Sequence, residues 1–182
     1  MTNYGVFKDV PLNAWYGDVV GKMAGLGLIQ GRDDGMFHPN DPITRAELAT
    51  MLGRVYSLDT TGTMPFSDVT PDAWYYDYVL SASNKGWIQG YSDGTFRPNG
   101  NATRAEFATM VNRVLGRQVD YRDLSSTIDA QITQFSDLDP SYWGYDAMIE
   151  ASNTHDYTSR DANGNEIWTD ITSNGLDAAF NR

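Results

Sequence analysis

Four residues, Thr44-Arg45-Ala46-Glu47, return 59 positions later as Thr103-Arg104-Ala105-Glu106. A threonine followed three positions later by a glutamate is typical of a capping box, in which both side chains bond main-chain amides at the start of a helix. Capping accounts fully for Glu47 and Glu106. It does not account for Arg45 and Arg104, because a cation at the first helical position faces the positive end of the helix dipole.

An arginine at the first helical position indicates one of two roles. Free amides, the helix dipole and a guanidinium group together form a site for a carboxylate or phosphate. Alternatively, the arginines form salt bridges with aspartates of a neighbouring repeat. The candidate aspartates are Asp9, Asp33, Asp34, Asp68 and Asp93. The sequence alone leaves both roles open.

Each motif begins the second of two helices that the apolar spacing predicts in every repeat. The apolar face of the second helix comprises Leu48, Met51, Leu52 and Val55 in one copy, and Phe107, Met110, Val111 and Val114 in the other. The face of the first helix comprises Trp15, Val19, Met23 and Leu26. That helix is expected to stop at Gly27, and its second copy at Gly86, because glycine tolerates a left-handed cap. Loops of turn composition follow at residues 31–35 and 90–94, and Phe37 and Phe96 are expected to anchor them to the core.

Three copies of this unit divide the chain. The predicted boundaries are repeat one at 1–56, a linker at 57–65, repeat two at 66–115, a longer linker at 116–134 that could carry a short helix at 124–132, and a degenerate repeat three at 135–182. The third copy keeps Thr172 as a helix cap but has Ser173 where the arginine stands. It also has His155 in the place of Gly27. This copy is expected to serve packing only.

The aromatic residues allow two interpretations. Trp15, Trp74 and Trp143 begin amphipathic helices, which favours core positions over ligand platforms. A second group is less constrained by helical spacing and consists of Tyr16, Tyr75, Trp87 and Tyr91. Aromatic faces beside Asn, Gln, Asp and Arg are what a sugar pocket uses, and they are also common on ordinary surfaces.

Composition excludes several classes of protein. The 182 residues carry a formal charge of −11 and no cysteine, so nucleic acid and anionic membranes are not expected partners. No apolar run approaches transmembrane length. His38 and His155 are isolated, and residues 161–166 lack the glycine and glutamate positions of a calcium loop. A turn is expected there, with no metal or cofactor. No nucleophile elbow, phosphate loop or dinucleotide fingerprint is present, so an enzyme is not expected.

The ordered motifs Phe-x-Asp-Val, Trp, Gly-(Leu/Trp)-Ile-Gln-Gly, Asp-Gly-x-Phe-x-Pro-Asn and Thr-Arg-Ala-Glu resemble the surface-layer homology repeat. The resemblance covers nearly the whole chain in three copies, the third in frame and core only. It implies a mostly α fold. Three tandem helix-loop-helix repeats would stand in a pseudo-threefold arrangement around a central three-helix bundle.

The resemblance also implies a function. The family attaches bacterial surface proteins non-covalently to the cell wall by binding acidic secondary cell wall polysaccharide, often pyruvylated, in grooves between repeats. An extracellular location at the bacterial surface layer follows, with other surface-layer subunits as further partners. The alternative is a structural or protein-interaction module of a surface-layer assembly that has lost glycan binding.

Carried onto this sequence, the resemblance centres ligand binding on the motif arginines and the neighbouring loops. The expected ligand-binding residues are Arg45, Glu47, Arg104, Glu106, Gly31, Asp33, Asp34, Gly90, Tyr91, Asp93, Trp15 and Trp74. Since Ser173 replaces the arginine in the third copy, at most two arginine-centred sites are expected.

Overall fold

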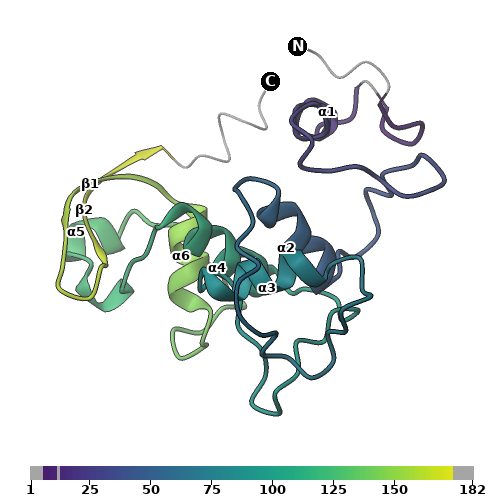
Figure 1. Ribbon diagram of the computed structural model, residues 1–182. Helices are drawn as coiled ribbons and strands as arrows, with labels where there is room; N and C mark the ends of the chain where they lie inside the picture. Colours follow the sequence, from purple (N-terminus) through teal and green to yellow (C-terminus); the bar gives the residue numbers. More distant parts are fainter. Residues whose placement is uncertain (1–5, 12, 174–182) are drawn as a thin grey trace. The chain divides into compact units, whose positions relative to one another are not determined.

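The computed structural model describes residues 6–11 and 13–173 and divides into two compact units, residues 1–102 and 103–182 (Figure 1). The boundary between Ala102 and Thr103 lies inside the predicted second repeat, directly before its Thr-Arg-Ala-Glu motif. The helix that the motif begins therefore belongs to a different unit from the rest of its repeat.

The first unit contains three helices, α1 (Gly17–Gly25), α2 (Arg45–Gly53) and α3 (Tyr76–Asn84). Helix α2 of repeat one packs against α3 of repeat two. A small core gathers Phe7, Val10 and Val20 beside α1. In this unit, the second helix of repeat one therefore packs against the first helix of repeat two.

The second unit repeats this exchange with α4 (Arg104–Leu115), which packs against α6 (Tyr145–Ser152). Along the chain, α4 and α6 are separated by the 3₁₀ helix η1 (Tyr121–Asp123) and the short α5 (Ser126–Asp129). Helix α5 lies within the stretch 124–132, where the sequence allowed a short helix. Strands β1 (Thr154–Arg160) and β2 (Glu166–Ser173) form an antiparallel hairpin, drawn in yellow in Figure 1, and β2 contacts α5. The core of this unit comprises Val119, Ile128, Ile132, Tyr145, Ile149 and Trp168.

The mostly helical class is confirmed, with the addition of one small sheet. The pseudo-threefold arrangement of three repeats stays a prediction. Among the described residues, no helix is both long enough and apolar enough to cross a membrane.

The capping boxes of α2 and α4 are confirmed. The amide of Glu47 donates to Thr44 Oγ1 at 3.2 Å, and the Thr44 amide donates to Glu47 Oε2 at 2.8 Å. Thr103 and Glu106 form the same pair of bonds at the same distances. A cap of this kind contributes about 0.5–2 kcal/mol to helix stability, so both glutamates have a sufficient structural reason to be present.

The helix stops at Gly27 and Gly86 are also confirmed, with φ angles of 73° and 71°. After α1, the amides of Gly27 and Leu28 donate back to the carbonyls of Ala24 and Met23. This pattern is the Schellman motif, which needs a left-handed residue at the glycine position. Asn153 occupies an extended conformation after α6, so the chain leaves that helix directly into β1.

The predicted apolar faces are only partly correct. In α2, Leu48 and Leu52 are buried, but Val55 is exposed beyond the end of the helix. In α4, Phe107 is exposed, and the buried side presents Ala105, Ala108, Met110 and Asn112. The buried Asn112 amide is hydrogen-bonded, because its Nδ2 donates to the Ala147 carbonyl of α6 at 2.9 Å.

Helix α1 departs further from the prediction. Trp15, Val19 and Leu26 are all exposed, and the helix buries Gly17 and Val20 instead. A nine-residue helix packed over a small core has one narrow contact line. The core contacts of α1 run through Val20 and Ala24, and the large apolar residues are left exposed.

The third copy follows a different path from the first two. Residues 154–173, which match a loop in repeats one and two, form the β1–β2 hairpin. Strand β2 includes Thr172 and Ser173, so Thr172 does not cap a helix as predicted. The rest of the expected helix lies outside the described residues. The turn predicted at 161–166 is confirmed between the strands, where Asp161 Oδ1 accepts from the amides of Asn163 and Asn165.

Candidate functional site

Arg45 is buried, with 3% of its surface exposed. Its Nε donates to the carbonyl of Phe96 at 2.7 Å and its Nη2 donates to the carbonyl of Gln89 at 3.0 Å. The guanidinium carbon also lies 4.6 Å from the ring centroid of Phe96 and 5.0 Å from that of Tyr91. Main-chain carbonyls were not among the partners considered from the sequence, and they make Arg45 a link between α2 and the loop of repeat two.

The first amides of α2 are used in the same way. The amide of Arg45 donates to the Gly100 carbonyl at 2.9 Å, and the amide of Ala46 donates to the Pro98 carbonyl at 3.0 Å. Together with the capping bond of Glu47, these contacts satisfy the donors that an anion would otherwise meet. The start of α2 is closed by protein.

The start of α4 is different. Arg104 is exposed, and among residues 6–11 and 13–173 no hydrogen bond or ion pair to its side chain is found. In the repeat frame, the residues that match Gln89 and Phe96 are Thr158 and Asn165. Thr158 lies within β1, and the Asn165 carbonyl accepts from the Asp161 amide. Because the hairpin has replaced the loop, Arg104 has lost the carbonyls that engage Arg45.

The aspartate of the Phe-x-Asp motif has a clear role that sequence reasoning missed. Asp68 accepts from the amides of Phe96 and Arg97, both at 2.8 Å. Asp9 accepts in the same way from the amides of Phe37 and His38. Burial acts to raise the pKa of Asp9, but the two donated amide bonds outweigh it and hold the pKa below its usual value. The repeated 28-residue spacing between aspartate and loop was the available signal.

The loop glycines Gly31 and Gly90 serve close packing. A Cβ atom at Gly90 would lie 2.5 Å from the Phe66 ring, and one at Gly31 would lie 2.5 Å from the Phe7 ring. Each of these phenylalanines stacks on the next loop aromatic, with centroid distances of 5.3 Å for Phe66–Phe96 and 5.5 Å for Phe7–Phe37. The anchoring of the loops through Phe37 and Phe96 is thereby confirmed.

The loop aspartates Asp34 and Asp93 hold their own turns. Asp34 accepts from the Met36 amide at 2.9 Å and contacts His38 Nε2 at 2.7 Å. Asp93 accepts from both the amide and the hydroxyl of Thr95 and pairs with Arg97 at 2.9 Å. The Thr95 hydroxyl, then Arg97 and the Thr95 amide, lower the pKa of Asp93 to about 2.

This pKa gives the first testable prediction. The Asp93 carboxylate is expected to titrate near pH 2, so its contribution to stability is present above the unfolded value of 3.8 and is lost as the pH falls through about 2. Carboxyl-carbon NMR during an acid titration measures the midpoint. Thr95→Ala should move it upward toward 3.8 because the hydroxyl bond is the largest cause. A midpoint near 3.8 in the unaltered chain would contradict the assignment.

The tryptophans that begin the first helices are not core residues. Trp15, Trp74 and Trp143 are 74%, 62% and 62% exposed. Trp15 and Trp74 each lie edge-on against the following tyrosine, Tyr16 and Tyr75, with ring centroids 5.4 and 5.2 Å apart. The core position predicted for them is wrong. The chain before each of these helices is in a turn conformation, and the indole is largely exposed.

A cavity of about 660 Å³ in the first unit includes Trp74 in its wall. The rest of the wall comes from the loop of repeat one and from α2 with its flanking residues. The lining residues are Leu28, Ile29, Gln30, Gly31, Arg32, Asp33, Phe37, His38, Pro39, Asp41, Ile43, Glu47, Thr50, Met51, Arg54 and Trp74. Arg54 braces the wall through a bond from Nη2 to Gln30 Oε1 at 2.9 Å, and Arg32 pairs with Asp41 at 2.8 Å.

The predicted site residues thus fall into separate groups. Gly31, Asp33, Glu47 and Trp74 line the cavity. Arg45, Tyr91 and Asp93 gather around the loop of repeat two, where Arg97 lies 3.9 Å from the Tyr91 ring and also pairs with Asp93. Arg104 and Glu106 stand on α4 in the second unit. Trp15 and Asp34 are not among the residues that line the cavity.

Comparison with known proteins agrees with the repeat pattern. The family model described as the S-layer homology domain matches residues 6–49 and 65–108. These segments correspond to the first two predicted copies up to the start of their second helices. The third predicted copy is not among the matched residues.

Curated relatives carry names from the bacterial cell surface. The chain is 31% identical over 168 residues to a cellulosome-anchoring protein of Acetivibrio thermocellus, covering 88% of this chain and 35% of that protein. It is 31% identical over 141 residues to the S-layer protein sap of Bacillus anthracis, covering 76% of this chain and 16% of that protein. It is also 34% identical over 121 residues to an amylopullulanase of Thermoanaerobacterium thermosulfurigenes, covering 63% of this chain and 6% of that enzyme.

The chain spans about a third or less of the length of these relatives. In the amylopullulanase, the shared region is a small part of a much larger protein. The matches therefore point to a non-enzymatic module rather than to a catalytic domain. The names of the relatives indicate a location at the bacterial cell surface. Residues 6–49 and 65–108 of the chain are therefore two repeats of the S-layer homology domain family.

Proposed function

We propose that the chain anchors a bacterial surface protein non-covalently to the cell wall by binding an acidic wall polysaccharide, with pyruvylated sugar as the group recognised. The observation that carries the proposal is the exposed guanidinium of Arg104 at the first position of α4. A chain of net charge −11 can hold a polyanion only at focused cationic points. Arg104 is such a point, and a helix start favours an anion.

The cavity in the first unit is a second, separate candidate contact for the glycan. An exposed indole such as that of Trp74 offers an apolar face to a pyranose ring, and the amide and carboxylate groups around it offer partners for sugar hydroxyls. In this proposal Arg45 acts as a positioning residue. It fixes the loop of repeat two through its bonds to Phe96 and Gln89.

The test is the binding of purified wall polysaccharide to the full chain. Arg104→Ala is expected to weaken binding at least about tenfold, the loss of one charge-assisted contact. Arg122→Ala is the matched control, because Arg122 is an exposed arginine of the same unit whose charge is paired with Asp120 at 2.6 Å. Equal binding by Arg104→Ala and the unaltered chain would sink the assignment.

A second comparison separates glycan anchoring from a protein-interaction role. The chain should no longer bind cell wall from which the polysaccharide has been chemically extracted. Retention on extracted wall would favour a protein or peptidoglycan partner instead. Binding through focused charge should also weaken as salt rises, which a titration with sodium chloride measures.

A further inference from the structure

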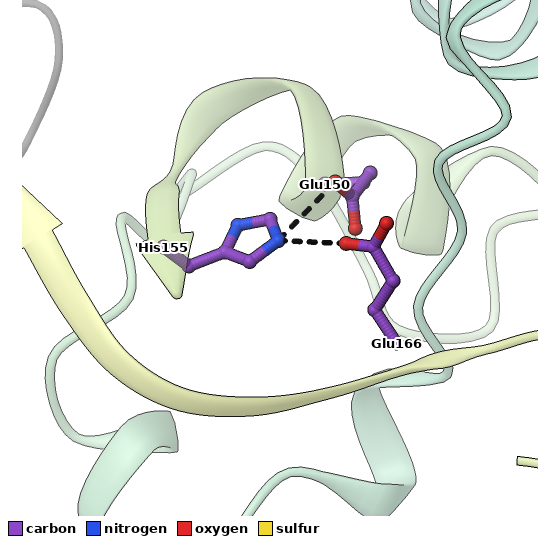
Figure 2. A group of neighbouring side chains, drawn as sticks. All are labelled: Glu150, His155 and Glu166. Atoms are coloured by element: carbon purple, nitrogen blue, oxygen red, sulfur yellow. Dashed lines mark hydrogen bonds and ion pairs between the residues drawn. The ribbon is translucent and has the colours of Figure 1, made fainter. Parts of the chain in front are cut away.

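Three titratable side chains come together inside the second unit. Glu150 from α6, His155 from β1 and Glu166 from β2 each offer one ligand atom, and these atoms all lie within 4.8 Å of one another. Figure 2 shows the His155 ring pointing at both carboxylates. The three side chains are 0–1% exposed. No local sequence pattern indicates this cluster, because the residues come from three elements that the hairpin brings together.

The two ring nitrogens of His155 have distinct surroundings. Nδ1 lies 2.9 Å from the carbonyl oxygen of Asn153, which can only accept, so Nδ1 carries a hydrogen. Nε2 lies 2.9 Å from Glu166 Oε2 and 3.6 Å from Glu150 Oε1. A histidine whose Nδ1–H is fixed by a main-chain carbonyl presents Nε2 in the orientation found in metal sites. The Trp168 ring stacks on the imidazole at 3.7 Å and fixes its plane.

The carboxylates are supported from outside by two arginines. Arg117 Nη2 lies 2.8 Å from Glu150 Oε1, and Arg160 Nη2 lies 3.0 Å from Glu166 Oε1. Both arginine side chains are partly exposed, at 35% and 43%, so solvent screens their charges. Arg160 holds the Glu166 oxygen that does not face His155, whereas Arg117 contacts the same Glu150 oxygen that faces the imidazole. Groups that orient carboxylate ligands in this way commonly surround a metal site.

Glu150 has Arg117 as an ion-pair partner, but its hydrogen bonding is incomplete. Its side chain is wholly buried, and neither of its carboxylate oxygens has a hydrogen-bond partner with acceptable geometry among residues 6–11 and 13–173. Burying an ionised carboxylate without hydrogen bonds costs several kcal/mol. A buried acceptor aimed at an imidazole nitrogen and a second carboxylate is what a cation would stabilise.

We propose that Glu150, His155 and Glu166 bind one divalent transition-metal ion, with Zn²⁺ as the best match. One imidazole nitrogen and two carboxylate oxygens are ligands that zinc accepts, with water completing the coordination. The imidazole disfavours Ca²⁺ and Mg²⁺, which take oxygen ligands. The ion would tie β1 and β2 to α6, the stretch where the third copy departs from the helix-loop-helix pattern.

The experiment uses the full chain after treatment with a chelator and dialysis. Calorimetric titration with Zn²⁺ should show one equivalent bound with saturation, and the melting temperature should rise by several degrees at a hundredfold excess over Kd. Because Trp168 stacks on His155, zinc should also change tryptophan emission, and Trp168→Phe should remove that change. Mg²⁺ at the same concentration should do neither.

Variants separate this site from chance binding. Glu150→Gln and Glu166→Gln keep the shape of the side chains and should each weaken Zn²⁺ binding at least about tenfold. His38→Ala removes the only other histidine of the chain and should leave the binding unchanged. The proposal is overturned if the unaltered chain binds no zinc, if both glutamine variants bind as tightly as it does, or if His38→Ala abolishes binding. Circular dichroism confirms that each variant is folded, and the unaltered chain decides the matter if they are not.

Discussion

Arg45→Ala is expected to lower the free energy of unfolding by at least about 3 kcal/mol. Two hydrogen bonds from a charged donor are lost, and such bonds contribute about 1.5–3 kcal/mol each where the group is buried. The contact of the guanidinium with the Phe96 ring adds to this. The Phe96 carbonyl belongs to a residue with 0% exposure, so little water can replace the arginine. Urea unfolding of the full chain, followed by circular dichroism, measures the change.

Arg104→Ala is the matched control for that measurement. It alters the same motif position in the other copy, but Arg104 is exposed and its side chain bonds to none of the described residues. Its removal is expected to change stability by no more than about 0.5 kcal/mol, the range of ordinary surface substitutions. A slight gain is also reasonable, because a cation leaves the positive end of α4. Equal effects of the two substitutions would contradict the contrast between a closed and an open helix start.

Arg45→Lys tests whether geometry or charge matters. Lysine keeps the cation but lacks the planar fork that reaches two carbonyls and stacks on aromatic rings. Most of the stability lost in Arg45→Ala should therefore also be lost in Arg45→Lys. Full recovery by lysine would show that the charge alone stabilises the contact between α2 and the loop.

Asp68→Ala is the second substitution with a large expected effect, a loss of about 2–3 kcal/mol. The carboxylate accepts two amide bonds at 2.8 Å, each a charge-assisted bond. One of those amides belongs to Arg97, whose φ of 57° is a left-handed conformation. That conformation costs a residue with a side chain about 1–2 kcal/mol, so it needs the aspartate to hold it. Thermal and urea unfolding measure the loss.

Asp137→Ala provides the control, because Asp137 occupies the same motif position in the third copy. The amides that match those of Phe96 and Arg97 belong there to Asn165 and Glu166. They donate instead to Asp161 Oδ1 at 2.8 Å and to the Gln118 carbonyl at 2.7 Å. Asp137 is exposed and does not accept these two amide bonds. Asp137→Ala should therefore lower the free energy of unfolding by less than about 0.5 kcal/mol. A large loss in Asp137→Ala would show that the three copies still share one construction.

The two pairs together connect stability to the proposed function. Arg45 and Asp68 both act on the loop of repeat two, from α2 and from the Phe-x-Asp motif. Their loss should lower the free energy of unfolding. Arg104→Ala should weaken glycan binding without loss of stability. A variant that separates binding from folding is therefore available only in the second copy of the motif.

Local interactions explain what could be predicted from the sequence. The capping boxes at Thr44 and Thr103, the glycine stops at Gly27 and Gly86, and the turn at Asp161 all depend on residues within five positions of one another. Their chemistry is complete in a short stretch of chain. The repeat, and with it the family, could also be recognised from the sequence, because the spacing of the motifs is the same in the two matched copies.

Only the tertiary structure determines that Arg45 is buried and Arg104 is exposed. They occupy identical motifs, and local helix energetics treats them alike. Arg45 is buried because carbonyls 44 and 51 residues further along the chain meet it. Arg104 remains open because the matching segment of the third copy pairs with itself as a β-hairpin. The same hairpin places His155 between Glu150 and Glu166. Long-range contacts have no signature in a local pattern, so the sequence determined where the helices start, and the packing of the next repeat determined which arginine was left to bind a ligand in the proposed site.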